Sequence, residues 1–230
     1  MNILLRSELE HETIASADVY WAITREESEA ILDAYAPRDV QYLPVSIDCE
    51  KYAVLAPASG RVDCFAHLGT LGLKKSPGMA AFVREVWPIV CEHLPSAELL
   101  LGGRVTYGRL GTRPGIRAIG YIEDEVGFLA GARFFLNTQT IGAGVKLPSL
   151  VYLAAGRVLV SGDVGVQGMA IQHVVNYWNL RELRETQSLD VFWRQSDLHE
   201  QIAGAGRAWV VAHHSRTAIC DAMRAVWGGL

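Results

Sequence analysis

The sequence has few of the features that mark zinc-binding, disulfide-bonded or nucleic-acid-binding proteins. Its 230 residues include only four cysteines, scattered without a Cys-x-x-Cys pair, so we predict neither a zinc site nor a disulfide framework. No block of basic residues occurs, and the formal net charge is −4. Nucleic acid and anionic membrane surfaces are therefore not expected partners.

Long apolar runs are missing as well. No stretch approaches the roughly eighteen apolar residues that a membrane-spanning helix needs. The apolar run at residues 3–5 is too short for the core of a signal peptide. These absences predict a cytoplasmic protein without an integral membrane span.

What is present is a large apolar fraction in an alternating arrangement. Half of the residues are hydrophobic, which is enough to bury a full core in a chain of this length. Short β-branched or aromatic runs take turns with stretches of helical spacing, which predicts an α/β fold with a doubly wound, Rossmann-like parallel sheet. The expected strands are 61–66, 97–101, 116–119, 134–136 and 158–160, and the expected helices are 77–93, 123–132 and one that follows residues 142–144 and ends at 155.

The two ends of the chain carry further elements. A capping box of Thr24 and Glu27 predicts the start of an N-terminal helix. The connector at 44–60 contains two prolines and little periodicity, so we place a boundary near Ser59 and divide the chain into 1–58 and 59–230. The other expected elements are strands at 18–23 and 40–43, the helix at 24–35, and a helical C-terminal tail at 180–193, 198–213 and 217–227.

The stretch from 138 to 169 holds a candidate binding element. Gly142 and Gly144 form a loop, Lys146 follows it, and Gly156 is placed to end the next helix. Glycines let the backbone approach a ligand, the first amides of a helix carry partial positive charge, and lysine adds a point charge, so the loop is suited to a diphosphate. The same pattern also suits a tight connection without a ligand.

Six segments, taken in order, are similar to those of one enzyme family. Together they resemble the C-terminal, donor-binding half of a group 1 glycosyltransferase of the GT-B fold, preceded by a remnant of the acceptor domain. The segments are the strand and helix at 15–27, the hinge-like 43–48, the strand–helix–strand pieces at 65–69, 81–88 and 97–104, the base-reading segment at 116–122, the glycine loop with its lysine and helix, and the tail at 199–215.

The resemblance implies a donor site for a nucleotide-sugar. Lys146 matches the lysine that binds phosphate in the family, and the backbone around Tyr121 matches the segment that reads the nucleotide base. Arg104, at the end of a strand, is a candidate phosphate partner, with a surface arginine as the alternative. The candidate donor-binding residues are Gly69, Arg104, Tyr121, Ile122, Gly142, Gly144, Lys146 and Val151. No metal ligand is among them.

Some positions depart from the family pattern. Val151 stands where the family has a glutamate that hydrogen-bonds the ribose of the donor. Thr70 stands where an arginine is common, although Lys74 and Lys75 follow closely. A valine accepts no hydrogen bond, so a ribose contact worth roughly 1.5 to 3 kcal/mol would be missing.

The resemblance implies a retaining, hexosyltransferase-type glycosyltransferase that takes a UDP- or GDP-sugar, transfers its sugar to an unknown acceptor and needs no cofactor. No catalytic base can be named, because the family takes its acceptor contacts from the acceptor domain. One alternative is a non-catalytic scaffold or subunit that partners a separate acceptor-domain protein, and another is a piece of a longer enzyme. We also expect a homo-oligomer or a protein partner to cover the apolar remnant of the acceptor domain.

Overall fold

A computed structural model of the chain describes residues 11–14, 16–35, 37, 39–72, 76–104, 113–185, 192–193 and 195–228. The chain forms two compact units. The larger consists of Ile47–Ala212, and the smaller of Met1–Ser46 with His213–Leu230. The division near Ser59, placed at the end of the proline-containing connector, stays a prediction.

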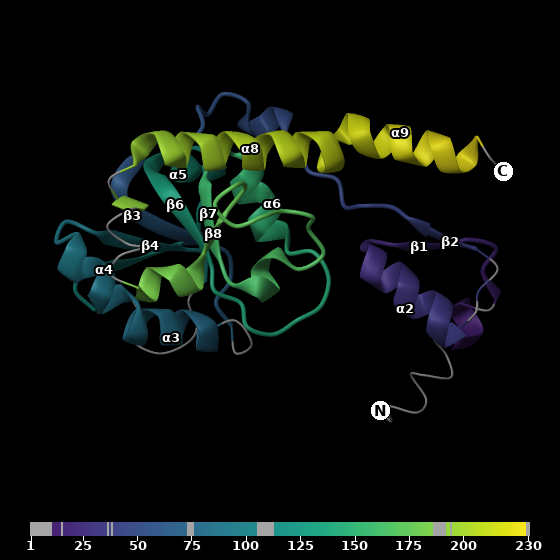
Figure 1. Cartoon of the computed structure of the whole chain (residues 1–230), viewed down its shortest axis with the longest axis horizontal. Helices are drawn as coiled ribbons and strands as arrows, with labels where there is room; N and C mark the ends of the chain where they lie inside the picture. Colours follow the sequence, from purple (N-terminus) through teal and green to yellow (C-terminus); the bar gives the residue numbers. More distant parts are fainter. Residues whose placement is uncertain are drawn as a thin grey trace. The chain divides into compact units, whose positions relative to one another are not determined.

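The larger unit is built on six parallel strands (Figure 1). They are β3 (Arg61–Leu68), β4 (Glu98–Gly102), β5 (Ile116–Gly120), β6 (Ala132–Asn137), β7 (Val158–Ser161) and β8 (Trp178–Asn179). Their order across the sheet is β5-β4-β3-β6-β7-β8. The order reverses between β3 and β6, which is the doubly wound arrangement of a Rossmann-like sheet. The predicted fold class is confirmed.

Alternating aromatic residues of the central strands explain why helices cover both faces. Phe134 of β6 packs against His199 of a C-terminal helix, with ring centroids 5.0 Å apart. The next residue, Phe135, points to the other face and packs against Phe128 and Tyr152. Because successive side chains of a strand point to opposite faces, one pair of phenylalanines anchors both helical layers, and all three of these aromatic partners lie on helices.

The helices of the larger unit match most of the predicted ranges. They are α3 (Ser76–Glu85), α4 (Trp87–His93), α5 (Glu125–Gly131), α6 (Leu147–Ala154) and, continuing into the smaller unit, α8 (Ser196–His214), with the 3₁₀ helices η1 (Glu50–Tyr52), η3 (Asp163–Val166) and η4 (Leu180–Arg184). The predicted helix at 77–93 is two helices that meet beside Pro88, whose ring cannot continue a straight helix. As predicted, α6 ends before Gly156, which adopts φ +63°.

The predicted tail helix at 180–193 is wrong at its start. Trp178 and Asn179 form the edge strand β8, and only the short 3₁₀ helix η4 follows them. Residues 186–191 lie outside the described part of the chain. A strand of two residues has no periodicity of its own, so its pairing with β7 could not be read from the sequence.

The smaller unit is a strand–helix–strand motif with a C-terminal helix. Its elements are β1 (Tyr20–Ala22), α2 (Arg25–Tyr35), β2 (Val40–Tyr42) and α9 (Arg216–Trp227). The two strands are parallel. The predicted cap at Thr24 is confirmed, because Glu27 donates its backbone N–H to the Thr24 hydroxyl oxygen (3.0 Å). The Glu27 carboxylate accepts the N–H of Ile23 (2.9 Å), one residue before the position expected in a capping box. None of the described helices is both long and apolar enough to cross a membrane.

Candidate functional site

Three glycines at the ends of adjacent strands make the floor of the candidate site. Gly69, Gly103 and Gly120 follow or end β3, β4 and β5, and each has a positive φ, of +139°, +101° and +84°. The backbones are in direct contact: a β-carbon added at Gly103 would lie 2.5 Å from the carbonyl oxygen of Gly69. Only glycine fits this close approach. The strand ends can therefore meet without side chains between them.

Backbone hydrogen bonds hold these turns together. Gly69 donates its N–H to the Gly102 carbonyl (2.9 Å), and Gly103 donates to the Gly120 carbonyl (2.6 Å). Leu71 donates to the carbonyl of Arg104 (2.9 Å). The main chain that carries the Arg104 side chain is thus fixed before any ligand arrives.

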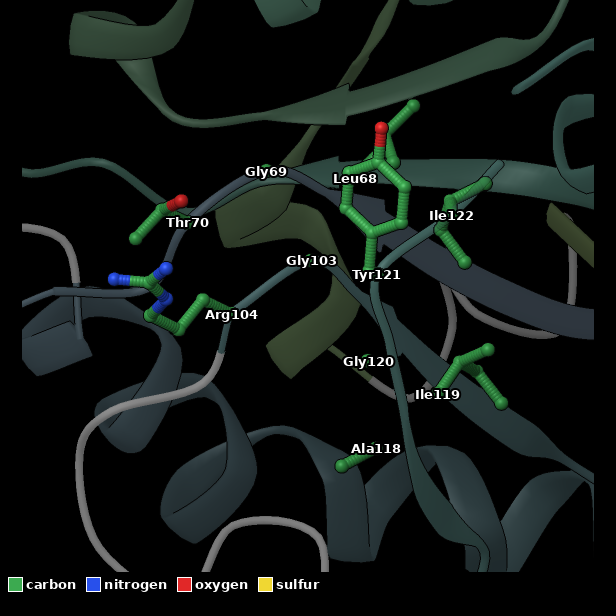
Figure 2. Close-up of a pocket in the computed structure, with 10 residues that line it drawn as sticks. All are labelled: Leu68, Gly69, Thr70, Gly103, Arg104, Ala118, Ile119, Gly120, Tyr121 and Ile122. Carbon is green, nitrogen blue, oxygen red and sulfur yellow. The ribbon is translucent and has the colours of Figure 1, made fainter. Parts of the chain in front are cut away.

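These turns open into a cavity of about 680 Å³ at the carboxyl edge of the sheet. Figure 2 shows three apolar side chains, those of Leu68, Tyr121 and Ile122, on one side of the glycines and the side chains of Thr70 and Arg104 on the other. Arg104 is the one charged residue among the described residues that line it. The complete lining is Leu68, Gly69, Thr70, Gly103, Arg104, Ala118, Ile119, Gly120, Tyr121 and Ile122.

The cavity has the chemistry of a site for an anionic ligand with an aromatic or apolar part. Tyr121 is 86% exposed and Ile119 is 40% exposed, so apolar surface stands open beside the arginine. A planar ring can stack on a tyrosine, and a guanidinium can pair with phosphate in a bidentate manner. Volume and lining are those of a site for a small organic molecule.

The second candidate element, the glycine loop, follows β6 at the same edge of the sheet. Gly142 and Gly144 have φ values of +127° and +70°. Below the loop, buried Asn137 donates to the Ser149 hydroxyl (2.8 Å), which donates to the carbonyl of Gly165 (2.6 Å). This chain of hydrogen bonds ties the start of α6 to the end of β6 and to η3, which follows β7.

Lys146 does not direct its side chain outward, as a lysine that contacts a phosphate would. It is the N-cap of α6 and only 6% exposed. Its ammonium donates to the Ala143 carbonyl (3.1 Å) and to the Gly144 carbonyl, so the charge is directed into its own loop. Burial lowers its pKa, because water no longer solvates the charged form.

The structure separates the eight predicted site residues into two groups. Gly69, Arg104, Tyr121 and Ile122 line the cavity. The other four, Gly142, Gly144, Lys146 and Val151, belong to the loop and α6 and are not among the described residues that line it. Val151 is half-buried in α6. Lys74 and Lys75 lie outside the described residues.

Sequence reasoning missed part of the lining. Leu68, Ala118 and Ile119 were not singled out, and Thr70 was noted only as a departure from a family pattern. All of them lie within two residues of Gly69 or Gly120, the glycines at the ends of β3 and β5. Their position directly beside those glycines, at the carboxyl ends of β3 and β5, is the signal that would have found them.

Comparison with known proteins identifies the fold. No family model and no curated protein matches the sequence. Solved structures do match. HepE from Anabaena in complex with UDP has a TM-score of 0.77 at 14% identity, over 100% of this chain and 69% of HepE. Sucrose-phosphate synthase from Thermosynechococcus elongatus has a TM-score of 0.74 at 13% identity, over 100% of this chain and 62% of that enzyme.

A variant of S. aureus TarM in complex with UDP also matches, with a TM-score of 0.76 at 11% identity over 96% of this chain and 46% of TarM. HepE, TarM and sucrose-phosphate synthase are glycosyltransferases of the GT-B type. The chain therefore has a GT-B glycosyltransferase-like fold, as its sequence segments predicted. It spans about two-thirds of HepE and less than half of TarM.

Proposed function

We propose that this chain is the donor-binding part of a glycosyltransferase, which binds a UDP- or GDP-sugar and transfers the sugar to an acceptor. The observation that carries the proposal is the cavity over Gly69, Gly103 and Gly120, with Arg104 on one side and exposed Tyr121 on the other. HepE, which has the same fold, was crystallised with UDP and with UDP-glucose. That similarity supports the same class of ligand.

The proposed roles follow from the charges. The base and ribose would lie against Tyr121 and Ile122, and the diphosphate would extend toward Arg104 and the start of α6. As the bond to the sugar breaks, negative charge grows on the diphosphate, and fixed positive groups stabilise it. In this proposal Lys146 supplies one such group once its ammonium turns from the loop carbonyls to the phosphate. Retention of configuration, a hexose as the transferred group and the lack of a cofactor belong to the proposal.

A second candidate function is a non-catalytic subunit that partners a separate acceptor-domain protein or a second copy of the chain. Three observations favour it. Val151 offers no hydrogen bond to a ribose, and Lys146 is engaged within its own loop. The smaller unit also exposes apolar surface: Trp21 is 37%, Ile23 42% and Trp227 57% exposed. Such surface is typical of a protein interface.

Calorimetric titration with UDP, GDP and UDP-glucose tests the proposal. We expect the wild-type chain to bind a nucleoside diphosphate. Lys146→Ala should abolish this binding, because it removes both the cation and its hydrogen bonds to the loop carbonyls. Release of free or transferred glucose from UDP-glucose would favour the enzyme over the subunit. If the chain binds none of the three ligands, the donor-site proposal is refuted. Light scattering would then test the subunit hypothesis by measuring self-association of the chain.

A further inference from the structure

A buried tyrosine joins the two groups of candidate site residues. Tyr152 of α6 is fully buried, and its ring packs on Phe135 with centroids 4.8 Å apart. Its hydroxyl accepts the backbone N–H of Leu68 (2.9 Å) and donates to the carbonyl of Leu68 (2.9 Å). One oxygen atom thus satisfies both backbone groups of a residue that lies 84 positions earlier in the chain.

The position of Leu68 explains why a hydroxyl is needed there. Leu68 is the last residue of β3, and its neighbour Gly69 donates to Gly102 on the β4 side. Alternate residues of a strand direct their backbone groups to opposite sides, so the groups of Leu68 face β6. The pairing of β3 with β6 ends at Ala66. The Tyr152 hydroxyl takes the place of the missing strand partner, and a phenol suits this role because it donates and accepts at once.

This contact lies between the two parts of the candidate donor site. Leu68 and Gly69 line the cavity, whereas Tyr152 lies six positions after Lys146, the N-cap of α6, on the same short helix. The hydroxyl therefore fixes the distance between the cavity and the loop with Lys146. A ligand that reaches only the cavity does not depend on that distance, but a ligand that reaches both parts does.

We infer that Tyr152 is a positioning residue that holds the cavity and the glycine loop at the spacing a nucleoside diphosphate requires. The inference rests on the proposed function. The phenol acts in its neutral form, since burial raises its pKa. Its contribution is geometric. The base and ribose occupy the cavity, and the diphosphate reaches the start of α6 only when the end of β3 lies at the right distance from α6.

The test compares a long ligand with a short one in Tyr152→Phe. The Kd for UDP should rise about tenfold or more, whereas the Kd for uridine, which lacks the diphosphate, should change by no more than about twofold. GDP and guanosine replace this pair if the wild-type chain prefers guanine. If Tyr152 had a merely structural role, the variant would weaken the binding of both ligands alike or of neither. Tyr177→Phe, which removes the hydroxyl of another buried tyrosine, is the control and should leave both constants unchanged.

The outcomes separate this inference from the proposed function. If the wild-type chain binds neither UDP nor GDP, both fail. If it binds one of them and Tyr152→Phe leaves the ratio of the two constants unchanged, only the role of Tyr152 is overturned. Hydrogen exchange of the Leu68 amide in the wild-type chain gives a measurement that needs no variant. UDP should slow that exchange several-fold more than uridine does, and equal protection by the two ligands would also overturn the inference.

Discussion

The cavity at the ends of β3, β4 and β5 and the loop between β6 and α6 use similar parts in opposite ways. In both regions the chain reverses at glycines with positive φ, at the carboxyl edge of one sheet. In the cavity the glycine backbones contact each other, and the side chains of Arg104 and Tyr121 extend outward. In the loop the one cation, Lys146, is directed inward to carbonyls. The cation of the cavity is therefore exposed, whereas the cation of the loop is buried against its own backbone.

The largest effect should come from filling the contact between two glycines of the cavity floor. Gly103→Ala places a methyl group 2.5 Å from the Gly69 carbonyl oxygen, at φ +101°. Backbone cannot yield as a flexible side chain does, so we expect a loss of about 3 kcal/mol or more in the free energy of unfolding and no UDP binding. Guanidinium unfolding measures the first and calorimetry the second. A loss below about 1 kcal/mol would show that the floor is not rigid.

The next effect concerns the open cation of the cavity. Arg104→Ala should raise the Kd for UDP about 10- to 100-fold, since a charged hydrogen bond contributes roughly 1.5 to 3 kcal/mol. The free energy of unfolding should hardly change, because the side chain is exposed. Arg117→Ala is the matched control: it removes the same charge from β5 at a residue that does not line the cavity. Equal weakening by both variants would mean that Arg104 acts only through net charge.

The sequence predicted the sheet and part of the cavity, but not the contacts that Lys146 and Tyr152 make. The alternation of strands and helices predicted the sheet, because each short buried run had to pair with others, and two of the predicted site residues at strand ends, Gly69 and Arg104, do line the cavity. The direction of the Lys146 side chain could not be predicted, since it depends on where the carbonyls of Ala143 and Gly144 point after the loop has closed. The Tyr152–Leu68 contact joins residues 84 positions apart, and no local pattern carries such a pair.

A smaller effect should follow from the equivalent substitution in the loop. In Gly142→Ala the new methyl group would lie 2.6 Å from Nε2 of Gln139, the end of a flexible side chain, at φ +127°. The side chain can turn away, so only backbone strain remains, and we expect a loss of about 1 to 2 kcal/mol in the free energy of unfolding. The same denaturation experiment compares this variant with Gly103→Ala. A loss as large as that of Gly103→Ala would erase the difference in rigidity between the two regions.

The smallest effect should appear in the pH dependence of stability, and it tests whether the Lys146 ammonium stays buried in the ligand-free chain. Burial lowers its pKa in the folded state below the ordinary value of 10.5. Between the lowered pKa and 10.5 the unfolded chain binds more protons than the folded chain, so stability rises with pH in this window. Below the window the full cost of burying the charge is present.

Comparison with Lys146→Met isolates this effect. Tyr152, whose pKa is raised, lowers stability when the pH exceeds the ordinary pKa of tyrosine, but its contribution is common to wild type and Lys146→Met. The difference in unfolding free energy between the two should therefore move in favour of the wild type as the pH rises toward 10.5. A difference that stays constant over this range would mean that the ammonium is solvated and already free to meet a phosphate, and the contrast between an open cavity and a closed loop would then fail.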